Sequence, residues 1–277
     1  MESSSQMINE LSTQDIENLH AKFLHAKPFQ HVVIDNFLRP DVFTALSLEM
    51  SEYFGTNENK GKRWNTEAES GKWGSTGLQL PPGLKALDEY LKSSELIDLL
   101  QQISGFEDLQ VTANINGIGF SFFHAMKPGA YLGPHTDHTR DLNNGPYHVL
   151  NIIIYMSNTW DANWGGGTTI FEKNIKLATD IEYRPNRALV FMHSPWSVHG
   201  TQRISELAKT QRFSIYYDYY NDKPEPYKHL DVKRVKLLNS PHLFYLPTVF
   251  SYLKKKNIRY AKMHLAHLKQ HIIDFFR

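Results

Sequence analysis

The sequence predicts an α+β protein that is mainly β, with an antiparallel barrel or sandwich at its centre and helices at both ends. Three observations predict this class. Apolar residues recur at helical spacing before Gly105, short segments rich in Val, Ile, Phe and Tyr follow it, and helical spacing returns near the C-terminus. The β-like segments follow one another without intervening helices, so an alternating α/β sheet is not expected.

Helical periodicity marks the N-terminal part of the chain, at residues 8–24, 39–53 and 84–103. Pro40 suits the first turn of the second helix. The stretch 55–83 is rich in Gly, Asn, Lys and Trp and has no clear periodicity. An irregular stretch of this length in a compact domain is expected to be a lid or a binding loop, and Trp64 and Trp73 favour an ordered lid.

The predicted strands lie close together in the second half of the chain. They cover residues 109–126, 148–157, 168–172, 188–193 and 212–220, and Gly, Pro and Asn separate them. Helical spacing returns at 245–276. We therefore expect a domain over residues 1–222, with a C-terminal helical segment over 223–277 packed on it.

Charge and cysteine content restrict the possible chemistry. The chain has 277 residues, a net charge of +1 and no cysteine, so a metal ion must be held by His and carboxylate ligands. The segment 223–277 carries +9 and the remainder −8. This segment could bind an anionic substrate or partner or could simply be a solvated helical face, and nucleic acid is not expected. No leader-like or membrane-spanning apolar run is present, so we expect a cytoplasmic protein.

Three residues have the chemistry of a metal site. On a strand, residues two apart point to the same side, so His135 and Asp137 can bind one ion. His199 follows a β-like run 64 residues later and is the candidate third ligand. Two His and one carboxylate that leave one face of the ion open are typical of non-heme Fe(II) oxygenases, where a 2-oxo acid and O2 take the open positions. A second pair, His229 and Asp231, lies past the last predicted strand and is treated as coincidental.

A cosubstrate with a distant carboxylate also needs a fixed cation. Arg212 begins the last predicted strand, and Ser214, two residues later, faces the same way. A guanidinium with an adjacent hydroxyl suits a carboxylate clamp. An ordinary salt bridge is the alternative for Arg212 in isolation.

Five motifs in order resemble the prolyl-hydroxylase-like branch of the 2-oxoglutarate/Fe(II) oxygenases. They are residues 126–137 (MKPGAYLGPHTD), 150–157 (LNIIIYMS), 166–171 (GGTTIF), 197–200 (SVHG) and 212–214 (RFS). The resemblance covers residues 105–220, with a weaker similarity at 28–38. It implies a double-stranded β-helix (a jelly-roll or cupin-like barrel) with iron on His135, Asp137 and His199. It also implies that Arg212 and Thr169 contact 2-oxoglutarate.

One departure from the family concerns the keto end of 2-oxoglutarate. The family often has a Tyr three residues before the first metal His, where this chain has Leu132, and Tyr131 is one place off. Tyr131 could reach the site if a β-bulge at Gly129 or Gly133 shifts the register. Asn151 on another strand could replace it, or could satisfy a buried backbone group.

The resulting functional expectation is an Fe(II)- and 2-oxoglutarate-dependent dioxygenase that uses O2 and releases succinate and CO2. It would hydroxylate a C–H bond of a prolyl residue, an amino acid-type molecule or a biosynthetic intermediate, because the fold does not fix the substrate. A metal-dependent hydrolase or isomerase on a cupin-like barrel and a non-catalytic binding barrel are the alternatives. The first alternative gives Arg212 and Thr169 no role, and the second would predict a damaged triad.

Overall fold

The computed structural model describes residues 7–57, 60–64, 69–75, 78–111, 122–137, 145–172, 178–194, 196–223 and 236–237. The helices are α1 (Thr13–His25), α2 (Pro40–Thr56), α3 (Pro82–Tyr90) and α4 (Ser94–Ser104). No helix in the described part of the chain combines the length and apolarity needed to cross a membrane.

The helix predicted over 84–103 is two helices. The backbone of α3 ends near Leu91, and Ser93 begins α4 by accepting a hydrogen bond from the Leu96 amide with its side chain. Gly105 ends α4 with a left-handed backbone (φ 75°), a conformation that glycine adopts without strain. Apolar periodicity continues through the break, which is why the sequence did not reveal it.

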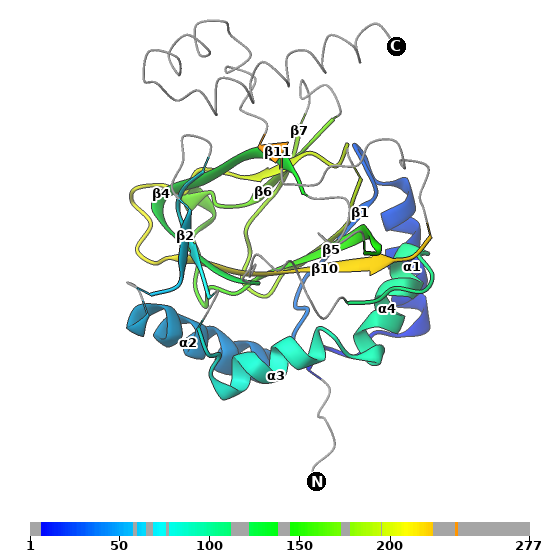
Figure 1. The fold of residues 1–277 in the computed structure, drawn as a ribbon, viewed down its shortest axis with the longest axis horizontal. Coiled ribbons are helices and arrows are strands. Elements are labelled where there is room, and N and C mark those ends of the chain that lie inside the picture. Colours follow the sequence, from blue (N-terminus) through cyan, green and yellow to red (C-terminus); the bar gives the residue numbers. More distant parts are fainter. Residues whose placement is uncertain are drawn as a thin grey trace, which may run out of the picture.

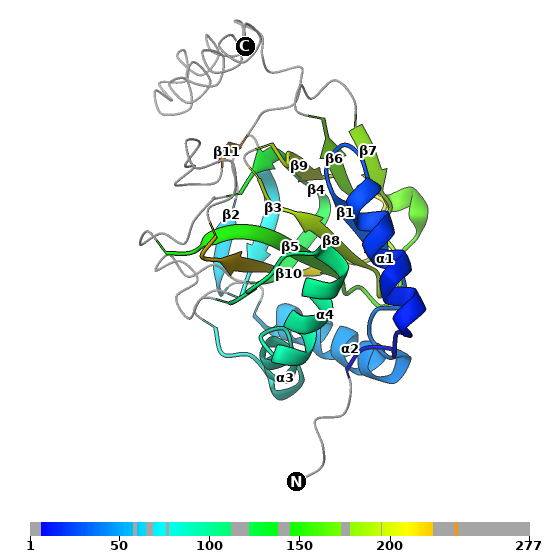
Figure 2. The same ribbon diagram turned by 90° about the vertical axis from the view of Figure 1, so that its right-hand side faces the viewer.

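The strands form one antiparallel, strongly curved sheet (Figures 1 and 2). They are β1 (His31–Ile34), β2 (Lys62–Trp64), β3 (Glu69–Gly74), β4 (Phe123–Thr136), β5 (Tyr147–Tyr155), β6 (Thr168–Phe171), β7 (Ala178–Ile181), β8 (Ala188–Met192), β9 (His199–Thr201), β10 (Arg212–Asn221) and β11 (Lys236–Leu237). The main order is β1-β8-β5-β10-β4-β9-β6-β7. A short 3-10 helix, η1 (Ala162–Trp164), precedes β6.

The long strand β4 joins the two layers of the barrel. Its first part pairs with β10, with Met126 opposite Arg212, and its last part pairs with β9, with His135 opposite His199. Between the two parts lies Gly129, whose φ of +80° favours glycine. This arrangement is the double-stranded β-helix that the resemblance predicted, flanked by N-terminal helices.

Strand β10 explains how the helices cover the barrel. Tyr217 and Tyr219 point outward to the helical layer, where the Tyr217 hydroxyl donates to Asp88 of α3 and the Tyr219 hydroxyl donates to the Leu91 carbonyl oxygen. Figure 1 shows α2 and α3 below β5 and β10. Because side chains alternate along a strand, Arg212 and the other residues of its parity face the barrel interior.

The described part of the stretch 55–83 is not the irregular loop that the sequence suggested. Its described part contains β2 and β3, which pair with each other, and β3 continues the sheet beside β4. Trp73 is 2% exposed and packs edge-on against Phe54 of α2, with 4.6 Å between ring centroids. The hairpin is therefore part of the sheet, and Trp73 belongs to the core.

Beyond Lys223, the C-terminal segment is described only at β11, which pairs with β4 opposite Thr136 and His135. This part of 223–277 therefore lies in the sheet itself. The predicted helix at 245–276 and the pair His229 and Asp231 lie outside the described residues. The domain division at residue 222 stays a prediction.

Candidate metal centre

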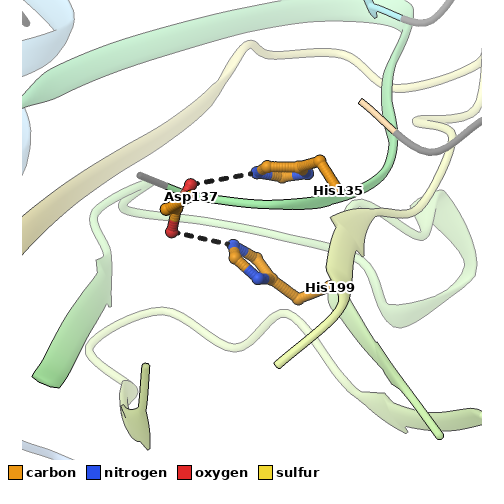
Figure 3. A group of neighbouring side chains, drawn as sticks. All are labelled: His135, Asp137 and His199. Atoms are coloured by element: carbon orange, nitrogen blue, oxygen red, sulfur yellow. Dashed lines mark ion pairs between the residues drawn. The ribbon is translucent and has the colours of Figure 1, made fainter. Parts of the chain in front are cut away.

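Two neighbouring strands bring the three predicted metal ligands together. His135 near the end of β4 lies directly opposite His199 at the start of β9, and Asp137 follows β4 by one residue. Gly200 lets the two strands approach closely, because a Cβ there would lie 2.8 Å from the Leu132 carbonyl oxygen. Figure 3 shows the two imidazoles and the carboxylate pointing toward one another.

The distances fit a single ion held by three residues. The Asp137 carboxylate lies 3.5 Å from the Nε2 atoms of both His135 and His199, through a different oxygen to each. One potential ligand atom from each residue lies within 4.8 Å of the others. Among the described residues, this is the one cluster of His, Asp and Glu with such spacing.

Both imidazoles are held with Nε2 facing the centre. Nδ1 of His135 lies 3.0 Å from the Gly133 carbonyl oxygen, and Nδ1 of His199 lies 3.0 Å from the Ser197 carbonyl oxygen. A carbonyl can only accept, so each Nδ1 carries a hydrogen, and Nε2 is the nitrogen of each ring that is left for a metal. Burial, followed by the proximity of His135, lowers the pKa of His199 to about 4, which keeps this ring neutral at pH 7.

The carboxylate of the cluster is ionised. Burial alone would raise the pKa of Asp137, but attraction to the rings of His199 and His135, which acts when these rings are protonated at low pH, holds this pKa well below its usual range. The side-chain amide of Asn151 on β5 donates to Asp137 Oδ2 at 3.3 Å. The centre thus offers two neutral nitrogen donors and one anionic oxygen donor, the set preferred by Fe(II) in facial sites.

Arg212 is a buried cation in the barrel, 3% exposed. Its Nε donates to the Gly166 carbonyl oxygen at 2.5 Å, and its Nη1 donates to the Ser214 hydroxyl at 2.8 Å. The guanidinium carbon also lies 5.3 Å from the ring centre of Tyr155 and 5.2 Å from that of Tyr183. Burial lowers its pKa, yet a guanidinium stays protonated in proteins.

Tyr155 and Thr168 complete the surroundings of Arg212, and the sequence reasoning missed both. The Tyr155 hydroxyl donates to the Thr168 hydroxyl at 2.7 Å. Both residues are buried, Tyr155 to 0% and Thr168 to 2% exposure. Tyr155 has the same strand parity as Asn151, which was singled out, so alternation along β5 could have found it.

Thr169, which the resemblance placed at the cosubstrate, lies on the other face of β6. Its hydroxyl donates to Asp180 of β7 at 2.6 Å, away from the Tyr155 and Arg212 side. Adjacent residues of a strand point to opposite faces, so Thr168 occupies the inner position instead. The sequence offers Thr at both positions, and nothing in it distinguishes them.

Of the remaining residues predicted to contact 2-oxoglutarate, two lie at the candidate site and one lies elsewhere. Ser214 lies beside Arg212 as expected. Asn151 contacts the Asp137 carboxylate. Tyr131 lies instead beneath the exposed side chain of Arg203, whose guanidinium carbon is 4.3 Å from its ring centre.

Comparisons with known proteins agree with this geometry. Residues 121–220 match the family model of the 2OG-Fe(II) oxygenase superfamily. A Pseudomonas putida prolyl-4-hydroxylase aligns with a TM-score of 0.50 at 19% identity, covering 73% of this chain and 98% of that one. A Trichoplax adhaerens prolyl hydroxylase, solved with a hypoxia inducible factor peptide fragment, aligns with a TM-score of 0.53 at 14% identity. The alignment covers 76% of this chain and 94% of that one.

A third structure of the same fold has a different chemistry. The α-ketoglutarate-dependent epimerase SnoN of nogalamycin biosynthesis aligns with a TM-score of 0.54 at 13% identity, covering 76% of this chain and 85% of that one. At these identities the structural likeness establishes the fold. The comparison with curated proteins finds no match.

Proposed function

We propose, from the premise that residues 121–220 form a domain of the 2OG-Fe(II) oxygenase superfamily, that His135, Asp137 and His199 hold its catalytic iron. The chain is a dioxygenase that depends on Fe(II), 2-oxoglutarate and O2. When bound, the iron would activate O2, which is the oxidant: one oxygen atom would be consumed in converting 2-oxoglutarate to succinate and CO2, and the other would hydroxylate an unactivated C–H bond. The protein residues fix the ligands, bind the cosubstrate and enclose the reaction.

The proposed iron ligands are supported by their donor chemistry. Each His has Nδ1 bonded to a carbonyl, which leaves Nε2 as the nitrogen that faces a metal. Asp137 supplies the negative charge that partly compensates the divalent ion. No thiolate exists in the chain to favour zinc or an iron-sulfur cluster.

The single observation that carries the cosubstrate assignment is the environment of Arg212. Its guanidinium is buried, and its partners among the described residues are neutral: a carbonyl, a hydroxyl, a thioether and two aromatic rings. A buried cation is costly unless an anion compensates it. The distal carboxylate of 2-oxoglutarate is such an anion, and Tyr155 and Thr168 offer hydroxyls beside it.

The metal ligands and the surroundings of Arg212 lie at different positions along β6, as an elongated dicarboxylate that reaches both would require. On β6, Ile170 is paired with His199, and Thr168 lies two residues before Ile170 on the same strand. Two residues of a strand span about 6.6 Å. The Thr168 hydroxyl accepts a hydrogen bond from Tyr155, whose ring lies near Arg212, so the clamp is displaced from the metal ligands along β6.

The alternatives explain less of this interior. A hydrolase or isomerase that uses a metal-bound water would give no role to a buried arginine on the same barrel. A binding barrel without catalysis would not require two imidazoles held in the metal-ready tautomer. Both leave the compensation of Arg212 without an explanation.

For the substrate, we propose a prolyl residue in a peptide, an amino acid-type compound or a biosynthetic small molecule. Support comes from neighbours of the same fold that are named as prolyl hydroxylases and as an enzyme of nogalamycin biosynthesis. The basic segment 223–277 remains a proposed binding region for an anionic substrate or partner, on the basis of its +9 charge alone.

Anaerobic titration of the Fe(II)-loaded protein with 2-oxoglutarate tests the proposal. We expect a visible charge-transfer absorption band that saturates at one 2-oxoglutarate per chain. Succinate, which lacks the keto group, should bind without producing the band. An Fe(II)-loaded protein that gives no band with 2-oxoglutarate would favour the hydrolase alternative.

A further inference from the structure

A buried chain of polar side chains leads away from the Asp137 carboxylate. Asn151 donates to Asp137 Oδ2 at 3.3 Å, and Asn151 Oδ1 lies 2.6 Å from Nε2 of His148. The same nitrogen of His148 lies 3.5 Å from Oδ1 of Asp218. All of the residues behind Asp137 are between 2% and 3% exposed.

The direction of each hydrogen bond in this chain is fixed by its neighbours. Nε2 of His148 faces two oxygens, one of Asn151 and one of Asp218, so it must carry the hydrogen and donate. The Asn151 oxygen therefore faces His148, and its NH2 group must face Asp137. The two neighbours of Asn151 thus favour the same orientation of its amide: His148 donates to the oxygen, and the acceptor-only carboxylate of Asp137 accepts from the NH2 group.

The surroundings hold His148 in place. Its ring stacks on that of His193, with centroids 4.0 Å apart and planes 7° apart. The Tyr220 hydroxyl donates to the second oxygen of Asp218 at 3.4 Å. Strand pairing adds to this, since Asp218 on β10 lies opposite Asn151 on β5.

We propose that Asn151, oriented by His148, is a positioning residue that keeps Asp137 a one-oxygen ligand. A carboxylate can bind a divalent ion through one oxygen or through both. The Asn151 amide engages Oδ2, which leaves Oδ1 for the iron. A second carboxylate oxygen on the iron would occupy a position that the 2-oxo acid needs. The inference rests on the proposed function and assigns Asn151 to the metal ligand, not to the keto end of 2-oxoglutarate.

If Asn151 has this role, its loss should weaken 2-oxoglutarate binding but not metal binding. A merely structural role would weaken both together. Without the amide, Oδ2 is free to join the metal, so Asn151→Ala should keep Mn(II) affinity within about threefold while weakening 2-oxoglutarate about tenfold or more. Loss of an ordinary support of a ligand typically lowers metal affinity itself by about 10- to 100-fold. Mn(II) affinity is measured by calorimetry without 2-oxoglutarate. The affinity for 2-oxoglutarate is measured from the Fe(II) charge-transfer band.

Two substitutions of His148 test the orientation step. His148→Phe keeps a ring against His193 but cannot donate, so it should reproduce the effect of Asn151→Ala. His148→Gln retains an N–H donor and should bind 2-oxoglutarate within about threefold of the wild type. Asn9→Ala removes an amide that donates to two backbone carbonyls far along the chain, and serves as the control with both affinities unchanged.

The outcomes distinguish this inference from the proposed function. If the wild type shows no metal-dependent 2-oxoglutarate binding, the proposed function is wrong. If the wild type binds 2-oxoglutarate but Asn151→Ala binds it equally well, or loses Mn(II) and 2-oxoglutarate affinity in parallel, the positioning role of Asn151 is wrong. Equal behaviour of His148→Phe and His148→Gln would overturn the orientation step.

Discussion

At the scale of single residues, the proposed metal centre has three protein ligands, and each of them is expected to be required. His135→Ala, Asp137→Ala and His199→Ala should each remove most of the Fe(II) affinity, because a facial site has only three protein ligands. Equilibrium dialysis against Fe(II) under anaerobic conditions measures this. His20→Gln, which changes a histidine bonded to the Ile103 carbonyl in the helical layer, is the control and should bind Fe(II) normally.

A variant of any of the three that binds Fe(II) as tightly as the His20 control would remove that residue from the proposed ligand set. The three variants should also behave alike. Retention of binding by one of them would point to a ligand outside the described residues.

Arg212 provides a second test at residue scale. Arg212→Met should weaken 2-oxoglutarate about ten- to a hundredfold, because it removes a charge-assisted contact worth about 1.5 to 3 kcal/mol. Fe(II) affinity should change little, since Arg212 contacts none of the three proposed ligands. Arg203→Ala removes an exposed arginine that donates to the Gly129 carbonyl and is the matched control. If Arg212→Met and Arg203→Ala give identical 2-oxoglutarate titrations, Arg212 does not bind the distal carboxylate and another residue must do so.

The sequence predicted the residues of the centre better than their partners. His135, Asp137, His199, Arg212 and Ser214 were recognisable because their chemistry and local spacing are unusual. The strand register that places His135 directly opposite His199 was not predictable, because the two histidines lie 64 residues apart. Tyr155 could be found only by counting strand positions from Asn151, because β5 is buried almost throughout and its polarity shows little alternation.

At the scale of elements, the β2–β3 hairpin is the largest difference from expectation. Trp73→Ala should lower the free energy of unfolding by about 3 to 5 kcal/mol, as expected for removal of a fully buried aromatic side chain. Urea unfolding measures it, and the exposed Lys60→Ala should stay within about 0.5 kcal/mol of the wild type. A Trp73 variant with unchanged stability but altered ligand binding would support the lid after all.

The sequence could not identify this hairpin because its residues are of types that are uncommon in strands. The strand segment of β3 contains a glycine with φ +69° at position 71, and the pairing with β4 shifts register beside it. Glycine and charged residues are depleted in strands, so the composition suggested a loop. Tertiary pairing with β4 and burial of Trp73 outweigh that preference.

A charge pair links the end of β1 to the start of β8. Arg187 donates to both oxygens of Asp35, at 2.5 and 2.9 Å, and its hydrogen bond lowers the pKa of Asp35. Because Asp35 is about half exposed, Asp35→Asn should cost only about 1 kcal/mol of unfolding free energy at pH 7.

The sign of the pH dependence of this pair follows from the lowered pKa. The contribution is fully present above the unfolded-state pKa of about 3.9 and is lost as the pH falls through the lower folded-state pKa. Urea unfolding should therefore show wild type and Asp35→Asn converging below about pH 4. A difference that stays constant down to pH 3 would assign the effect to packing and not to charge.

At the scale of the whole molecule, the fold class was predictable and the closure of the barrel was not. Antiparallel strand segments with N-terminal helices follow from composition and periodicity. The crossing of β4 from one layer to the other depends on its bend at Gly129 and on pairing with strands far along the chain. These contacts bring the metal ligands and Arg212 into one interior, which is what makes a single cosubstrate site possible.

The most direct measurement is the oxidation of 2-oxoglutarate itself. Protein loaded with Fe(II) and 2-oxoglutarate without oxygen, then exposed to O2, should release succinate and CO2 in equal amounts, even without the hydroxylated substrate. Asp137→Ala and Arg212→Met should release little under the same conditions. Wild-type protein that binds both Fe(II) and 2-oxoglutarate, yet forms no more succinate with O2 than the Asp137 variant, would contradict the assignment of this chain as a dioxygenase.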